Sequence, residues 1–208
     1  MKKILVAGIA FLMSLGVTMT VNAAGDAAKG KALFAVCVAC HGPNGEGNAA
    51  LHAPVIAGQE DWYVERQLNN FKAGIRGADP KDLYGAQMRP MAMTLTTDQA
   101  VADVAAYVAS LKPVKPATSL KGDAAAGQAS FAVCLACHGA NGEGNKALNA
   151  PRISGQFDWY VVQQINNFKT GIRGANPKDA FGMQMRPMAM TVATDDIAKN
   201  IAAFLATK

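Results

Sequence analysis

Two short segments hold the residues of this sequence that are best suited to chemistry. Residues 37–41 (CVACH) and residues 134–138 (CLACH) both follow the pattern Cys-x-x-Cys-His. This pattern is the attachment sequence of a c-type haem, whose two vinyl groups react with the two thiols. The histidine after the second cysteine is then placed to bind the iron from one side. The sequence therefore predicts two covalently bound haem c groups, held by Cys37, Cys40 and His41 and by Cys134, Cys137 and His138.

Three other uses of four cysteines fit these segments less well. A thioredoxin-like redox pair also uses Cys-x-x-Cys, but it requires a strand–helix setting that neither segment has. A zinc site can be built from two such pairs, yet it needs no histidine directly after each pair. Disulfides are common in exported proteins, but they do not account for the histidines either. The spacing favours haem attachment over all three.

The second axial ligand of each iron is indicated by counting histidines. The chain has three, and the third, His52, aligns with Asn149 in the internal repeat described below, so it cannot serve both irons. A thioether sulfur is the obvious alternative, although core packing is the ordinary role of methionine. Each half of the chain has a cluster of methionines before its last predicted helix, and spacing alone leaves every member open: Met88, Met91 and Met93, and Met185, Met188 and Met190.

The two Cys-x-x-Cys-His segments belong to a long internal repeat. Residues 26–111 align with residues 123–208 at a constant offset of 97 residues, without a gap, and about two thirds of the pairs are identical. Such self-similarity indicates two copies of one structural unit. We expect a first domain over residues 24–111, a proline-containing linker over residues 112–122 and a second domain over residues 123–208. Because each unit is small, a buried haem would supply much of the apolar surface that its core lacks.

Three segments of each unit have the patterns of helices. In the first unit, Asp26 is placed to cap a helix that ends near residue 36. Residues 62–72 and residues 97–111 carry apolar side chains at intervals of three and four residues. The remaining residues, including those around the methionines, are rich in Gly, Asn and Pro, so we expect long loops there and no strands. The sequence predicts an all-α fold of two tandem domains, each a small helical domain wrapped around a covalent haem.

The first residues have the features of a secretory signal peptide. Lys2 and Lys3 precede an apolar stretch over residues 4–21, and residues 21–23 (VNA) have the small-x-small pattern that signal peptidase cleaves. A membrane anchor is the alternative, because about 18 apolar residues nearly span a bilayer. We expect a signal peptide over residues 1–23, cleavage after about Ala23 and a periplasmic protein. The formal net charge is +5, without a basic run, which argues against nucleic acid as a partner.

The chain resembles the cytochrome c4 family, periplasmic di-haem proteins built from two class I cytochrome c domains. The matching features are residues 37–42 (CVACHG), 54–59 (PVIAGQ) and 67–74 (QLNNFKAG), and the methionine region before the last helix. In that family the iron-binding methionine lies seven residues before a leucine that opens the final helical region. The resemblance thus implies Met88 and Met185 as ligands, with Met91 and Met188 as the second choice. The extra Met93 and Met190 depart from the family pattern.

Other residues have weaker assignments, each with an ordinary structural role as the alternative. The resemblance implies that the carbonyl groups of Pro54 and Pro151 accept a hydrogen bond from the ligand histidines, which would orient these rings. Guanidinium groups suit the carboxylates of haem propionates, so the arginines of the two Gly-Ile-Arg-Gly segments and those beside the methionines are candidates for such pairs. We expect His52 to be a surface residue. The candidate arginines are Arg76, Arg173, Arg89 and Arg186. The aromatic residues expected to pack in the core, or to offer a polar group to a propionate, are Trp62, Tyr63, Trp159 and Tyr160.

Histidine on one face of the iron and thioether on the other leave no position for a substrate, and thioether ligation raises the reduction potential. The sequence therefore predicts a monomeric electron carrier and not an enzyme. The resemblance implies a quinol:cytochrome c reductase as donor and a terminal oxidase or other terminal reductase as acceptor, with membrane association only through such complexes.

Two further functions stay open. The first is the electron-accepting subunit of an oxidoreductase complex, such as flavocytochrome c sulfide dehydrogenase, whose haem subunit is similar. The second is an enzyme in its own right, for instance a di-haem peroxidase or thiosulfate dehydrogenase. Such an enzyme needs an exchangeable or unusual ligand at one haem, whereas both repeats present the same residues.

Overall fold

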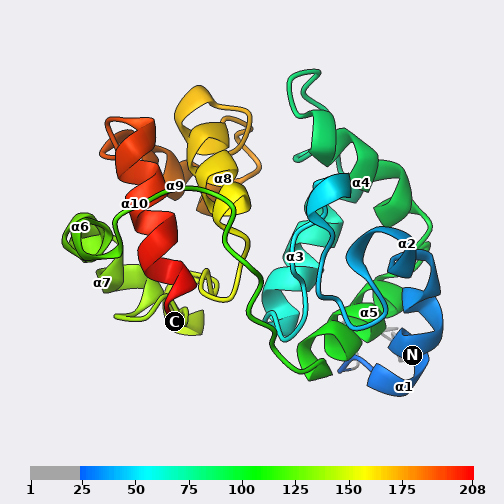
Figure 1. The fold of residues 1–208 in the computed structure, drawn as a ribbon. Coiled ribbons are helices and arrows are strands. Elements are labelled where there is room, and N and C mark those ends of the chain that lie inside the picture. Colours follow the sequence, from blue (N-terminus) through cyan, green and yellow to red (C-terminus); the bar gives the residue numbers. More distant parts are fainter. Residues whose placement is uncertain (1–23) are drawn as a thin grey trace, which may run out of the picture.

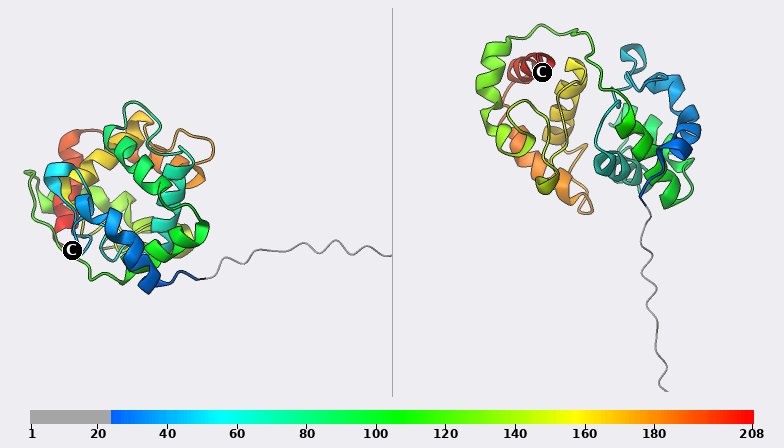
Figure 2. Two further views of the ribbon diagram at one scale, coloured as in Figure 1. Left: turned by 90° about the vertical axis from the view of Figure 1, so that its right-hand side faces the viewer. Right: turned by 90° about the horizontal axis from the view of Figure 1, so that it is seen from below.

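The computed structural model describes residues 24–208, so the predicted signal peptide over residues 1–23 lies outside the described residues. The chain forms two helical lobes, joined by one extended connection (Figures 1 and 2). Residues 24–208 contain no strand, only the isolated bridges Asn48–Ala53 and Asn145–Ala150. Within the same residues, no helix has the length and apolar character needed to cross a membrane. The all-α prediction is confirmed.

The two lobes repeat the same order of elements. The first consists of α1 (Ala27–Leu33), η1 (Phe34–Val36), α2 (Val38–His41), η2 (Ala49–Leu51), α3 (Asp61–Lys72), α4 (Leu83–Met93) and α5 (Asp98–Ser110). The second consists of α6 (Ala124–Ser130), η3 (Phe131–Val133), α7 (Leu135–His138), η4 (Lys146–Leu148), α8 (Asp158–Thr170), α9 (Ala180–Met190) and α10 (Asp195–Ala206).

Two of the three helices predicted in the first domain begin at a capping side chain. The side chain of Asp26 accepts hydrogen bonds from two backbone N–H groups in the first turn of α1, and Thr97 caps α5 in the same way. Such caps satisfy N–H groups that have no partner inside the helix. The predicted helices over residues 26–36, 62–72 and 97–111 correspond to α1 with η1, to α3 and to α5.

The methionine clusters lie in helices, which differs from the predicted loops. α4 contains Gly85 and Pro90, two residue types with low helix propensity. The side chain of Asp82 nevertheless caps this helix by accepting a hydrogen bond from the N–H of Gly85 at 3.0 Å. Gly85 and Ala92 are buried, and α4 packs against α3. Tertiary packing therefore outweighs local propensity, and the same holds for α9.

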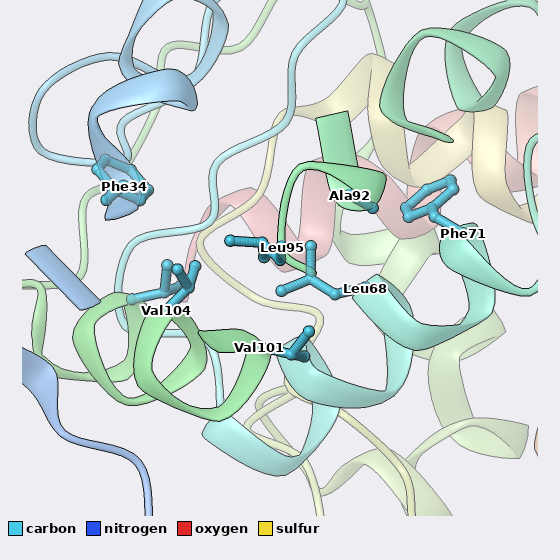
Figure 3. Packing of buried hydrophobic residues seen from close by; sticks show 8 residues of the cluster. Phe34, Leu68, Phe71, Ala92, Leu95, Val101 and Val104 are labelled. Atoms are coloured by element: carbon cyan, nitrogen blue, oxygen red, sulfur yellow. The ribbon is translucent and has the colours of Figure 1, made fainter. Parts of the chain in front are cut away.

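A small core holds each lobe together behind its haem segment. In the first lobe, side chains from η1, α3, the end of α4 and α5 converge (Figure 3). Helix α1 can approach α5 closely because Gly30 has no side chain, and a Cβ at this position would clash with the carbonyl of Asp103. The second lobe has a matching core of Phe131, Val192, Ala198, Ile201, Phe204 and Leu205.

The connection between the lobes is fixed to the second one. The backbone N–H groups of Ser119 and Leu120 donate to the carboxylate of Asp158, at the start of α8, at 2.6 Å. Burial raises the pKa of Asp158, but these hydrogen bonds outweigh it and hold the pKa below its ordinary value. The connection is thus an ordered part of the second lobe near residue 119.

Candidate haem-binding sites

One cavity contains both Cys-x-x-Cys-His segments. Its volume is about 550 Å³, and residues of both lobes line it. The walls are largely apolar and include Phe34, Val104, Phe131 and Ile201. An apolar cavity with a few convergent polar groups is the usual form of a cofactor site. The predicted attachment and ligand residues all line it: Cys37, Cys40, His41, Met88, Cys134, Cys137, His138 and Met185.

No disulfide joins the four cysteines within residues 24–208. Each pair is held by a single helical turn, which brings residues three apart to the same face. Burial, together with the neighbouring Cys40, raises the pKa of Cys37 to about 11, and burial likewise raises that of Cys134. A thioredoxin-like redox pair requires a strand–helix setting, and residues 24–208 contain no strand, so this alternative does not fit the structure.

The two motif histidines are buried and oriented in the same way. His41 is 4% exposed and its Nδ1 lies 2.9 Å from the carbonyl oxygen of Pro54. His138 is 6% exposed and its Nδ1 lies 2.8 Å from the carbonyl oxygen of Pro151. Burial lowers the pKa of both histidines, against the effect of these hydrogen bonds. With the Nδ1–H donated to a carbonyl, the Nε2 lone pair of a neutral ring is left for a metal.

The six clustered methionines divide by position. Met88 and Met185 are half-buried and line the cavity. Met91 and Met188 also line it but are 37% and 41% exposed. Met93 and Met190 are 56% and 64% exposed and do not line it. Exposure and position thus reduce the candidates to the first two pairs.

Two buried arginines have no acidic partner. Arg76 and Arg173 are each 6% exposed, and the ion pairs among residues 24–208 are Lys29–Asp26 and Lys199–Asp196, which are elsewhere. Arg76 donates to Gln67 at 2.8 Å and Arg173 donates to Gln164 at 2.7 Å. The Nε of each arginine has no partner within the described residues. Buried cations are costly without a paired anion, so the cavity suits a ligand that carries carboxylates.

The other two predicted arginines do not line the cavity, whereas Tyr63 and Tyr160 do. Arg89 is exposed, and Arg186 is half-buried beside a separate surface pocket that Met190 also lines. The predicted core aromatics are half-buried and belong to neither core, so the prediction of core packing is wrong. Trp159 and Tyr160 pack edge to face, as do their counterparts Trp62 and Tyr63. Burial raises the pKa of Tyr63, but the nearby cations, Arg173 first, outweigh it and hold the pKa below its ordinary value.

The sequence analysis missed the residues that join the two lobes. The guanidinium of Arg66 donates to the carbonyl of Asn149 at 3.0 Å and lies 4.5 Å from the ring centre of Phe181. His52 is exposed, as predicted, but its ring stacks on Tyr84 at 4.1 Å and meets Trp159 at 5.3 Å. One feature of the sequence does indicate this interface. The two repeats differ in residue type at these positions, since Arg66 aligns with Gln163 and His52 with Asn149.

Comparisons with known proteins agree with this description. The family model for cytochrome c matches residues 27–112 and residues 124–208. The chain is 38% identical to cytochrome c4 of Azotobacter vinelandii, over 91% of this chain and 93% of that protein. It is 36% identical to a thiosulfate dehydrogenase electron acceptor of Thiomonas intermedia, over 69% of this chain and 67% of that protein. The crystal structure of reduced cytochrome c4 from Pseudomonas stutzeri has a TM-score of 0.71 and 30% identity, covering 88% of this chain and 98% of that one.

Proposed function

The chain belongs to the cytochrome c4 family, and we propose that His41 with Met88, and His138 with Met185, bind the two irons. As a member of this family the protein holds two covalent haem c groups, transfers electrons and is a carrier rather than an enzyme. We take its domains to be residues 24–111 and 123–208, with residues 112–122 as the linker, and its first 23 residues to be a signal peptide for export to the periplasm.

Different residues of the cavity bind different parts of the haem. The thiols of Cys37 and Cys40 form the thioether links, and the Pro54 carbonyl keeps the ring of His41 in one orientation. Arg76 supplies positive charge for a propionate, and the second domain repeats this arrangement with Arg173. When bound, the haem supplies a one-electron couple at its iron.

The observation that carries the ligand assignment is the placement of the methionines. Met88 and Met185 are half-buried in the wall of the cavity that holds the motif histidines, whereas their neighbours are more exposed. A thioether opposite the histidine raises the reduction potential and leaves no open position for a substrate. Both properties suit an electron carrier.

The optical spectrum of the oxidised protein tests this assignment. Thioether ligation gives a far-red sulfur-to-iron band, so we expect Met88→Ala and Met185→Ala each to remove about half of it. Met91→Ala and Met188→Ala are the matched controls and should leave the band in place. If the band is unchanged in Met88→Ala but halved in Met91→Ala, the ligand of the first iron is Met91 and not Met88. Rapid binding of carbon monoxide to the reduced wild-type protein would contradict closed coordination altogether.

For the redox partners we propose a quinol:cytochrome c reductase as donor and a terminal oxidase or reductase as acceptor. A second candidate role, electron acceptor of a substrate-oxidising dehydrogenase, is favoured by the similarity to the Thiomonas intermedia electron acceptor. Reduction kinetics with a purified thiosulfate dehydrogenase and with a quinol:cytochrome c reductase distinguish these roles. Faster reduction by the dehydrogenase would favour the second.

A further inference from the structure

Each ligand histidine is bonded to a peptide group that the other domain also contacts. In the first domain, the carbonyl of Pro54 accepts from His41, and the N–H of the same peptide, at Val55, donates to the side-chain oxygen of Gln156 at 2.9 Å. In the second domain, the carbonyl of Pro151 accepts from His138. The N–H of that peptide, at Arg152, donates to the carboxylate of Glu60 at 3.0 Å.

In both domains, therefore, the hydrogen bonds run from the histidine through one peptide group to a side chain of the other domain. The two side chains at the end differ. His41 is linked through one peptide to a neutral amide of the second domain, and His138 is linked through one peptide to a carboxylate of the first domain. The two domains differ here because the two repeats have different residues at this position: Glu60 aligns with Phe157. Gln59, the counterpart of Gln156, donates from its amide to the carbonyl of Arg152 at 3.0 Å, while its oxygen accepts from the N–H of Glu60 in its own domain.

On the basis of the function proposed above, we propose that Glu60 is a positioning residue that lowers the reduction potential of the haem in the opposite domain. Glu60 acts through the Pro151–Arg152 peptide and His138, and the first haem has no charged group in the equivalent place.

The direction of the effect follows from two mechanisms with the same sign. A carboxylate that accepts from an N–H polarises the peptide and makes its carbonyl a stronger acceptor. A histidine that donates to a stronger acceptor is a more basic ligand, and a more basic ligand favours the oxidised iron. The negative charge of Glu60 also favours the more positive oxidation state through space.

The positive charge of Arg152 does not cancel the effect of Glu60 on the Pro151–Arg152 peptide. The guanidinium of Arg152 is turned to the first domain, where it donates to the carbonyl of Ala57 at 2.9 Å. The positive charge of Arg152 is present in the wild-type protein and in a Glu60 variant, so its effect on the potential of the second haem is the same in both. The contribution of Glu60 is thus the difference between the carboxylate and a neutral side chain of the same shape.

A redox titration of the holo protein with Glu60→Gln measures this difference. Glutamine keeps an oxygen that can accept from the N–H of Arg152, so the contact between the domains is retained. We expect the second haem to be reduced three- to tenfold more favourably, which is a rise of up to 59 mV for one electron. The potential of the first haem should rise by clearly less, because only the through-space part of the effect acts on it. Met88→His and Met185→His, each of which lowers the potential of its own haem, assign the two steps.

Asp61→Asn is the matched control, because it removes one negative charge from the next residue. Asp61 is exposed, and its carboxylate accepts from the N–H of Trp62 and not from the second domain. A rise of the second potential in E60Q but not in D61N supports the proposal. An unmoved second potential, or an equal shift of both haems, overturns it. The far-red band, recorded on the same samples, tests the ligand set separately: its absence in the wild-type protein refutes the proposed function and not the role of Glu60 alone.

Discussion

The first and second domains have the same residue types around their histidines and several different ones where they meet. The attachment cysteines, the two prolines, the candidate methionines and the buried arginines are all repeated. Across the interface, however, Glu60 faces the second domain while its counterpart is Phe157, and Arg66 aligns with Gln163. Cofactor binding requires a full set of residues in each copy, whereas a contact between copies needs to be made only once. The interface is therefore where two nearly equal haem sites can become unequal.

The largest effects we predict come from the part that the domains share. Phe34 and Phe131 are 2% and 1% exposed, at equivalent places in the two cores. Replacing either with alanine should lower the free energy of unfolding by about 3–5 kcal/mol, to a similar extent in the two variants. Guanidinium unfolding of the holo protein measures this. Val36→Ala and Val133→Ala, at positions 45% and 49% exposed, are controls. If one phenylalanine variant loses less than half of what the other loses, the cores are not equivalent.

A smaller effect is expected where the domains differ. Arg66→Gln gives the first domain the residue that the second has, and it removes the hydrogen bonds to Asn149 and the contact with Phe181. We expect a loss of about 1–2 kcal/mol, because these bonds have a charged donor but are half-exposed. Thermal unfolding of the holo protein at low ionic strength gives the value. Gln163→Ala should change stability by less than about 0.5 kcal/mol. Equal losses in both variants would mean that the interface is symmetric after all.

The smallest effect concerns the linker and depends on pH. The folded-state pKa of Asp158 is lowered by its bonds to the linker, so its stabilisation is complete above the unfolded-state value, near 3.8. It is lost as the pH falls through the folded-state pKa. We expect Asp158→Asn to destabilise the protein by about 1 kcal/mol at neutral pH, and the difference from wild type to shrink below about pH 4. Unfolding at a series of pH values checks this.

Asp61→Asn, at the equivalent position of the first domain, provides the comparison. Asp61 bonds to no linker residue, only to the N–H of Trp62, so this variant should lose less stability at neutral pH. A loss as large as that of Asp158→Asn would show that the linker bonds contribute nothing.

Much of this molecule could be predicted from its sequence, because the haem segments are local patterns. Each Cys-x-x-Cys-His segment lies within one helical turn. The helices over residues 62–72 and 97–111 each have an apolar stripe, and the second also begins at a capping threonine. Helix α4 escaped prediction because Gly85 and Pro90 disfavour a helix, and the packing against α3 that helps to stabilise it cannot be seen in the local sequence. The interface escaped because bonds such as that from Arg152 to Glu60 join residues 92 positions apart, which no local pattern encodes.

The central claim, that each domain closes its iron with a histidine and its own methionine, is tested most directly by proton NMR of the reduced protein. A methionine methyl group held over a porphyrin has a resonance shifted far upfield by the ring current. We expect two such signals, one absent in Met88→Ala and the other absent in Met185→Ala. The absence of both signals from the wild-type spectrum, or the persistence of both in either variant, would contradict the account.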